Sequence, residues 1–363
     1  MTDRVVNFSA GPAVLPPSVL EEARRDLLSL PGAGISALEI SHRSTWFEGV
    51  IRAAEANIRD LLDVPSSYRV LLLQGGATMQ FSMVPMNLLR PGGTAGYVIT
   101  GTWGAKALVE ATRHGSAVAR WDGRPEGYVR VSPADDLAPG TGDAYLHITS
   151  NETIQNLEWR AGGEPDVPLL VCDTSSDFLS RPVPVRRYGL LYASAQKNAG
   201  PAGVTVVVMR EELLAQGPED LPLLLDYRTY ADHGSLYNTP PVFAIYVLEL
   251  VTRWLRDEVG GLAAQERRNR EKASLLYGGI DASGGFYRGH AAADSRSLMN
   301  VTWRLPSEAL EARFVSDAAG EGLVELKGHR SVGGIRASIY NGMPVEAVRA
   351  LAGFMEEFAR RHG

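Results

Sequence analysis

The sequence predicts an α/β protein with a large domain, in which a mostly parallel sheet is covered by helices, and a smaller α+β domain. Short apolar runs separated by helix-sized segments predict the sheet, because runs without polar alternation are typical of strands covered on both faces. After Pro241 the pattern changes to long amphipathic helices, which indicates a second folding unit. A chain of 363 residues is long enough for both parts.

The elements of the large domain begin with a helix over residues 18–32, in which Ser18 and Glu21 have capping-box spacing. Its apolar face is formed by Leu20, Ala23, Leu27 and Leu30. Residues 46–64 predict a second helix that stops before Pro65. Residues 68–89 predict a buried strand, a glycine turn and a helix. Further strands are expected within residues 94–101, 143–150, 167–175, 188–195 and 204–209.

The second part of the chain starts with a long amphipathic helix after Pro241. Gly260 and Gly261 interrupt the pattern, and a charged helix follows over residues 263–279. Strand patterns within 297–305 and 321–340 and a final helix over 345–363 predict a compact α+β domain. Because domain linkers are often Gly-rich, we place the boundary near residue 260. The predicted domains are residues 16–259, and residues 1–15 together with 260–363.

Composition narrows the class of protein. Hydrophobic residues make up 45% of the chain and charged residues 21%, which is ordinary for a globular protein. The net charge of -6 gives no basis for nucleic-acid binding. The start of the chain lacks the apolar core of a signal peptide, and its longest apolar runs have the length of strands. One cysteine, Cys172, fits a reducing compartment. We therefore expect a cytoplasmic protein with no nucleic-acid or membrane partner.

The stretch "ASAQKNAGPAG" carries Lys197 just beyond a predicted buried strand. Desolvation at a strand end disfavours the ammonium form and frees an amine nucleophile for Schiff-base chemistry. The alternative is a surface lysine in a hairpin. The position of Lys197 between two buried strands favours the chemical interpretation.

Two further segments fit a cofactor site at the carboxyl edge of the sheet. Asp173 ends the apolar run "LLVCD", where open α/β sheets bind ligands, and its carboxylate could keep a pyridinium nitrogen protonated. Its alternative role is a helix N-cap. The turn in "LQGGATMQF" would present backbone N–H groups and a helix dipole to a phosphate, or it is an ordinary turn. It matches neither the dinucleotide fingerprint nor the P-loop.

Cationic and aromatic residues suggest where an anionic substrate and a planar ring would bind. Two cationic groups lie in Gly/Ser-rich turns: His42 with Arg43, and His329 with Arg330 and Arg336. Arginine binds carboxylate and phosphate in bidentate geometry, although surface salt bridges are the alternative. Trp103 has glycines close by, so its ring could stack on a planar cofactor or simply belong to the core. No metal site is predicted.

These motifs, in this order, closely resemble the phosphoserine aminotransferase family, whose members are class V (fold type I) pyridoxal-phosphate-dependent enzymes. The resemblance covers essentially the whole chain. It rests on "NFSAGPAVLP", "SHRS", "QGGATMQF", "SNETIQ", "DTSSDFLSRP", "YASAQKNAGPAG", "LYNTPPVFAIY" and "LKGHRSVGGIRASIYN". It implies a fold type I large domain with a mostly parallel sheet of the seven-stranded type.

The resemblance also implies roles for individual residues. Lys197 would hold pyridoxal 5'-phosphate as a Schiff base and then move the proton between the substrate Cα and C4′ of the cofactor. The other implied cofactor contacts are Asp173 at the pyridine nitrogen, Trp103 on the ring, Thr153 on the phenolic oxygen side, Ala77, Thr78 and Gln196 at the phosphate, and Asn238 and Thr239 at the phosphate of the neighbouring subunit. The implied clamp for the substrate's phosphate and carboxylate is His42, Arg43, His329, Arg330 and Arg336.

The implied reaction transfers an amino group from L-glutamate to 3-phosphohydroxypyruvate, giving O-phospho-L-serine and 2-oxoglutarate by ping-pong kinetics through pyridoxamine phosphate. Action on a related phosphorylated 2-oxo acid in vitamin B6 synthesis, forming 4-phosphohydroxythreonine, is neither required nor excluded. A homodimer with shared active sites is implied. Some relatives carry arginine where this chain has Thr78, which removes one cation near the substrate.

Four other functions were weighed. A cysteine desulfurase needs a reactive thiol on a mobile loop, whereas Cys172 lies inside an apolar strand pattern. An alanine–glyoxylate or serine–glyoxylate aminotransferase would suit Lys197 and Asp173 equally, but it does not need several arginines. A non-catalytic binding protein could dispense with Lys197. A nicotinamide dehydrogenase lacks its glycine fingerprint here.

Overall fold

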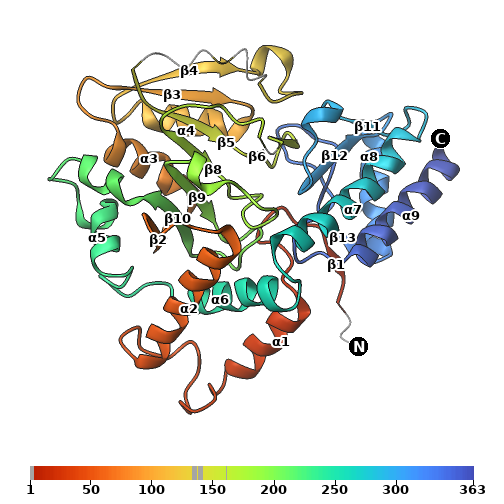
Figure 1. The fold of residues 1–363 in the computed structure, drawn as a ribbon. Coiled ribbons are helices and arrows are strands. Elements are labelled where there is room, and N and C mark those ends of the chain that lie inside the picture. The colour runs from red at the N-terminus through yellow and green to blue at the C-terminus, as the bar shows by residue number, and fades with distance from the viewer. Residues whose placement is uncertain (1–3, 133–136, 138–141, 161) are drawn as a thin grey trace.

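The computed structural model describes residues 4–132, 137, 142–160 and 162–363. Within them, seven strands form one large sheet in the order β2-β10-β9-β8-β5-β3-β4 (Figure 1). Strand β10 is antiparallel to both of its neighbours, and the other pairs are parallel. The strands are β2 (Tyr68–Leu73), β3 (Thr94–Ile99), β4 (Ser116–Asp122), β5 (Asp143–Thr149), β8 (Leu170–Asp173), β9 (Leu190–Ser194) and β10 (Thr205–Arg210). The predicted mostly parallel sheet is confirmed.

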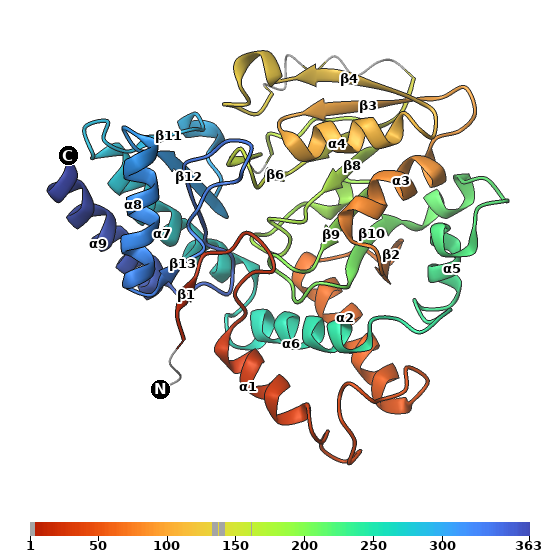
Figure 2. The same cartoon turned by 180° about the vertical axis from the view of Figure 1, so that it is seen from behind.

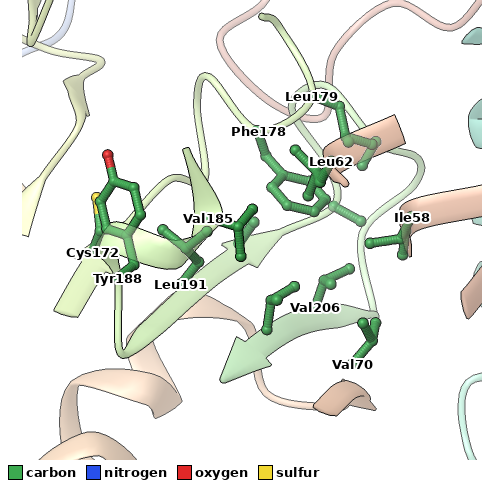
Figure 3. Close-up of a cluster of buried hydrophobic side chains, with 14 of the residues drawn as sticks. Ile58, Leu62, Val70, Cys172, Phe178, Leu179, Val185, Tyr188, Leu191 and Val206 are labelled. Atoms are coloured by element: carbon green, nitrogen blue, oxygen red, sulfur yellow. The ribbon is translucent and has the colours of Figure 1, made fainter. Parts of the chain in front are cut away.

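Helices cover both faces of this sheet. Helices α2 (Thr45–Leu62) and α6 (Val242–Asp257) pack on one face, and α3 (Gly76–Leu88), α4 (Thr102–Ala111) and α5 (Tyr227–Asp232) pack on the other. Alternate residues of one strand therefore enter different cores: Val70 and Leu72 of β2 face α2, whereas Leu71 and Leu73 join the core under α3. Two-sided burial explains the continuous apolar runs of the sequence. Figure 3 shows the first of these cores, with Ile58 and Leu62 of α2 above the sheet.

The C-terminal part forms a separate core beside the large sheet (Figures 1 and 2). Its helices are α7 (Leu262–Asp281), α8 (Glu308–Gly320) and α9 (Val345–His362). Its strands are β11 (Arg288–Gly289), β12 (Asn300–Arg304) and β14 (Ile335–Ser338) in one sheet, and β1 (Val6–Asn7) parallel to β13 (Leu323–Val324) in another. Phe8 is buried in this core, so the N-terminal segment packs with the C-terminal third of the chain. The domain limits given above remain a proposal.

The first helix differs from its sequence prediction. Helix α1 runs from Pro17 to Asp26 and begins after Pro16, with no side-chain cap. The expected capping box is wrong because Ser18 lies inside the helix, where its hydroxyl donates to Glu258 Oε2 at 3.1 Å. The chain leaves the helix at Asp26, although Leu30 still packs in the same core as Val19.

A short hairpin crosses between the two parts of the molecule. It pairs β6 (Asn151–Glu152) with β7 (Leu157–Glu158) directly after β5. The Nδ2 group of Asn151 donates to Asn300 Oδ1 of β12 at 2.8 Å, which ties the hairpin to the C-terminal part. Every helix in the described part of the chain is too short or too polar to cross a membrane.

Candidate active site

A cavity of about 290 Å³ lies at the carboxyl ends of β2, β5, β8 and β9. This is the edge at which parallel α/β sheets bind ligands, because loops and helix N-termini converge there. The cavity is lined by Gly75, Gly76, Ala77, Thr78, Trp103, Thr149, Asn151, Asp173, Ser175, Ser176, Ser194, Gln196 and Lys197. The structure thus brings together six of the residues that the sequence analysis assigned to a cofactor: Ala77, Thr78, Trp103, Asp173, Gln196 and Lys197.

Lys197 enters this cavity from the turn after β9. Its Nζ donates to Thr153 Oγ1 at 2.8 Å and lies 5.4 Å from the centroid of the Trp103 ring. Burial lowers the pKa of Lys197, and the nearby positive charge of Arg336 acts in the same direction, whereas Asp173 and Glu152 oppose the shift. A lowered pKa increases the share of neutral amine, which is the nucleophilic form.

Asp173 is the last residue of β8, and its side chain is buried. Burial raises its pKa, and the Ser175 N–H, which donates to Asp173 Oδ1 at 2.9 Å, opposes this shift. The backbone carbonyl of Asp173 accepts from the Ser150 N–H at 2.9 Å and from the Ser150 hydroxyl at 3.1 Å. The carboxylate is therefore fixed at the floor of the cavity, where it can accept a proton-bearing ring nitrogen.

The N-terminus of α3 borders the opposite end of the cavity. Gly75 and Gly76 have φ of 90° and 69°, which glycine adopts without strain and which turn the chain from β2 into the helix. A Cβ at Gly76 would lie 3.2 Å from Ser194 Oγ. Ser194 Oγ also accepts the Ala77 N–H at 2.6 Å. This hydroxyl and the helix dipole together form a cradle for an anion such as phosphate.

Trp103 lies in the first turn of α4 and presents its ring to the cavity. Within the described residues, its buried Nε1 has no hydrogen-bond partner, so a polar group of a ligand can meet it. Lys106, one turn later, places its Nζ 4.6 Å from the ring centroid on the same helix. The sequence analysis missed Lys106, although its spacing of three residues from Trp103 puts both on one helix face.

A group of cations lies on the side of the C-terminal part. Arg336, on β14, has a buried Nε without a hydrogen-bond partner in the described chain, and burial lowers its pKa. Burial also lowers the pKa of His329, and the charges of Arg336, Arg330 and Lys106 act in the same direction. Three of the predicted clamp residues therefore share one positive region with Lys106, and this region extends to Lys197.

The structure does not bring the remaining predicted residues into this cavity. His42 and Arg43 lie in the turn before α2, and Asn238 and Thr239 lie in the segment before α6. None of these four lines the cavity. The Thr239 carbonyl accepts from Gln74 Nε2 at 3.2 Å. Their assigned roles stay predictions, and a second chain would have to supply them.

Two residues that the sequence analysis did not assign are central to the site. Glu152 binds the first turn of α4, and Ser194 binds the first turn of α3. Both contacts join residues that are far apart in sequence, so local patterns carry no signal for them. Glu152 stood next to Thr153 in a motif already singled out, but only the fold shows its partner.

A lysine, a carboxylate and an anion cradle at the carboxyl edge of a seven-stranded sheet define an enzyme that binds an aldehyde cofactor bearing a phosphate. The sequence model of the family "Aminotransferase class-V" matches residues 5–351. The chain therefore belongs to the class-V aminotransferases.

Within that class, the relatives identify the group. A phosphoserine aminotransferase from Rhodopirellula baltica is 54% identical over 99% of this chain and 96% of its own length. The one from Laribacter hongkongensis is 54% identical over 99% of both chains. The solved phosphoserine aminotransferase of Bacillus circulans subsp. alkalophilus is 49% identical, with a TM-score of 0.97 over the whole of both chains. The chain belongs to the phosphoserine aminotransferase family and is a transaminase.

The cofactor of this class is pyridoxal phosphate. A phosphoserine aminotransferase from Trichomonas vaginalis solved with this cofactor is 37% identical, with a TM-score of 0.92 over 97% of this chain and all of its own. The cavity fits the group: the glycine turn before α3 leaves room for a phosphate, and the buried Asp173 and the unpartnered Trp103 Nε1 face the space between. When bound, pyridoxal phosphate withdraws electrons from the substrate Cα through its pyridine ring.

Proposed function

We propose that this protein transfers the amino group of L-glutamate to 3-phosphohydroxypyruvate, giving O-phospho-L-serine and 2-oxoglutarate, the transamination step of serine biosynthesis. The observation that carries the proposal is the positive region beside Lys197. Arg336, His329, Arg330 and Lys106 interact electrostatically with one another, and Arg336 also acts on Lys197. A substrate with both a carboxylate and a phosphate needs several such cations.

The residues of the chain divide the work. Asp173 holds a proton at the pyridine nitrogen, and Trp103 covers the ring. Lys197 Nζ, oriented by the Thr153 hydroxyl at 2.8 Å, moves the proton between the substrate Cα and C4′ of the cofactor. The Arg336 guanidinium, whose Nε is buried without a partner in the described chain, binds the substrate carboxylate. His329 and Arg330 bind the substrate's second anionic group.

We further propose that the active form is a homodimer in the cytoplasm. The anion cradle at α3 is supported within one chain only by Ser194 and backbone N–H groups. Asn238 and Thr239 lie outside the cavity of their own chain, so they would reach the phosphate of the partner's cofactor. His42 and Arg43 would likewise need a second chain to join the clamp.

A spectral titration of the purified holoenzyme tests the proposed reaction. L-Glutamate is expected to bleach the visible band of the bound cofactor, and 3-phosphohydroxypyruvate should restore it far better than pyruvate or glyoxylate. Equal restoration by glyoxylate or pyruvate would remove the argument from the cations and leave only the transaminase. A band that glutamate does not change would refute glutamate as the amino donor.

A further inference from the structure

Helix α4 receives its N-terminal cap from another segment. Its N-cap residue is Gly101, which has no side chain to accept a hydrogen bond, and α4 makes no cap of its own. Instead, both oxygens of the fully buried Glu152 carboxylate accept backbone N–H groups of the first turn. Glu152 Oε2 accepts from Trp103 at 2.9 Å, and Oε1 accepts from Gly104 at 2.8 Å. A helix usually takes its cap from a Ser, Thr, Asp or Asn at its own N-cap position.

A neighbouring residue of the same hairpin completes this contact. Gln155 Oε1 accepts the Thr102 N–H at 3.1 Å, and its Nε2 donates to Thr102 Oγ1 at 2.7 Å. Gly101 leaves the space that both side chains need, because a Cβ there would lie 2.6 Å from Gln155 Oε1 and from Glu152 Cδ. The first turn of α4 is thus bonded at three consecutive N–H groups to one hairpin.

The same hairpin also holds the lysine amine. Thr153, adjacent to Glu152, accepts from Lys197 Nζ at 2.8 Å. Successive residues therefore fix the turn that carries Trp103 and the group that lies 5.4 Å from its ring centroid. Burial raises the pKa of Glu152 to about 7, and its two backbone hydrogen bonds oppose that shift. A buried carboxylate is costly unless each oxygen is hydrogen-bonded, and here each one is.

We propose that Glu152 is a positioning residue, which acts through the first turn of α4 to hold the Trp103 ring at a fixed distance from Lys197 and thereby sets the affinity for the cofactor. This inference rests on the proposed contact of Trp103 with the cofactor ring. Glutamine at this position keeps the shape but offers one acceptor oxygen, so one of the two N–H groups loses its partner.

The first test uses the full chain without cofactor. Hydrogen exchange of the segment 101–106 is expected to be roughly tenfold faster in Glu152→Gln than in the wild type, because the first turn opens more often. Glu110→Gln is the matched control: Glu110 is on the same helix and accepts from Ser82 Oγ at 2.8 Å, away from the first turn. Equal exchange of segment 101–106 in Glu152→Gln and Glu110→Gln would overturn the proposal.

The second test measures pyridoxal phosphate affinity by equilibrium dialysis in a double-mutant cycle. Trp103→Phe alone should weaken binding, and if it does not, the proposed cofactor contact of Trp103 fails. In the wild-type background, Glu152→Gln should raise Kd roughly tenfold, and in the Trp103→Phe background by less than about twofold, because the effect passes through Trp103. An equal rise in both backgrounds, or no rise in the first, would overturn the role of Glu152 while leaving the reaction intact.

Discussion

Two lysines close to Trp103 differ in how far the sequence identifies them. Lys197 stands between two buried strands, and that local pattern alone indicates an unusual environment. Lys106 lies on the exposed side of an ordinary helix, and only its cation–π contact with Trp103 and its electrostatic effect on His329 place it near the site. Burial is encoded locally by hydrophobic runs, whereas charge clustering depends on how elements pack.

Replacing Lys106 tests its membership of the positive region. Lys106→Met is expected to raise KM for the phosphorylated keto acid roughly fivefold, because one cation facing a multiply charged anion is lost. Lys106→Arg should keep most of the affinity. Steady-state kinetics with 3-phosphohydroxypyruvate and with uncharged-side-chain keto acids give the measurement. The same loss with pyruvate would show that Lys106 acts on the shared carboxylate or on Trp103 instead.

Lys272 is a buried lysine outside the active site. Its Nζ donates to the carbonyls of Ile339 and Tyr340 at 2.8 and 2.6 Å, and burial lowers its pKa to about 7. Between that pH and the unfolded pKa of about 10.4, the unfolded chain binds a proton that the folded chain does not. The free energy of unfolding therefore gains about 1.4 kcal/mol per pH unit from this group as pH rises above 7.

Urea unfolding at pH 7, 8 and 9 checks this prediction. The difference in unfolding free energy between the wild type and Lys272→Met should rise in favour of the wild type as pH increases. Lys106→Met, which removes an exposed lysine, is the control and should show no such slope. A flat difference for Lys272→Met would mean that Lys272 stays charged when folded.

At the level of elements, the sequence predicts best where both faces are buried. Strands β3, β5, β8, β9 and β10 all fall within the expected ranges, because two-sided burial produces continuous apolar runs. Strand β4 was not predicted: it is an edge strand whose residues are only partly buried, and its sequence mixes charges with apolar residues. The capping box at Ser18 failed because a favourable local spacing was overridden by a contact with Glu258. Side-chain bridges between distant elements, such as Glu152 with α4, leave no local pattern.

The loop that carries His329 and Arg330 depends on a glycine. The Gly328 N–H donates to the Gly334 carbonyl at 2.8 Å and closes the loop. A Cβ at Gly328 would lie 2.0 Å from the Gly333 carbonyl oxygen, which is backbone and cannot move aside. Gly328→Ala is therefore expected to raise KM for the phosphorylated substrate at least tenfold while cofactor affinity changes little.

The matched control is Gly353→Ala in α9, where a Cβ meets nothing within 4 Å. That variant should keep wild-type kinetics and gain up to about 1 kcal/mol of stability, because alanine favours the helix. Kinetics and cofactor dialysis on both variants give the comparison. Unchanged KM in Gly328→Ala would show that the loop does not contribute to substrate binding.

At the scale of the whole molecule, one chain supplies the cavity and the lysine but leaves four predicted residues outside it. The order of motifs in the sequence identifies the family, because so many segments match together. It does not show which residues face one another across a subunit boundary, since a residue's partner in a second copy leaves no spacing in the chain. The proposal of shared sites must therefore be tested on the assembly.

A mixed dimer provides that test. Lys197→Ala and Asn238→Asp are each expected to be inactive as homodimers, the first for lack of the amine and the second because a carboxylate repels the phosphate. Co-expressed in equal amounts, they should recover about a quarter of wild-type activity, since half of the dimers are mixed and one of their two sites is intact. Activity no higher than that of the parent homodimers would show that Asn238 serves its own chain.

The pairing of β1 with β13 has a consequence for synthesis. Val6 and Asn7 pair with Leu323 and Val324, and Phe8 is buried among residues of the last third of the chain. On the ribosome, the first segment to emerge must wait for almost the last before its apolar side chains are covered. A chain truncated before Leu323 would therefore lose the anchor of its own beginning as well as its end, so unfinished products would expose Phe8 and be open to quality control.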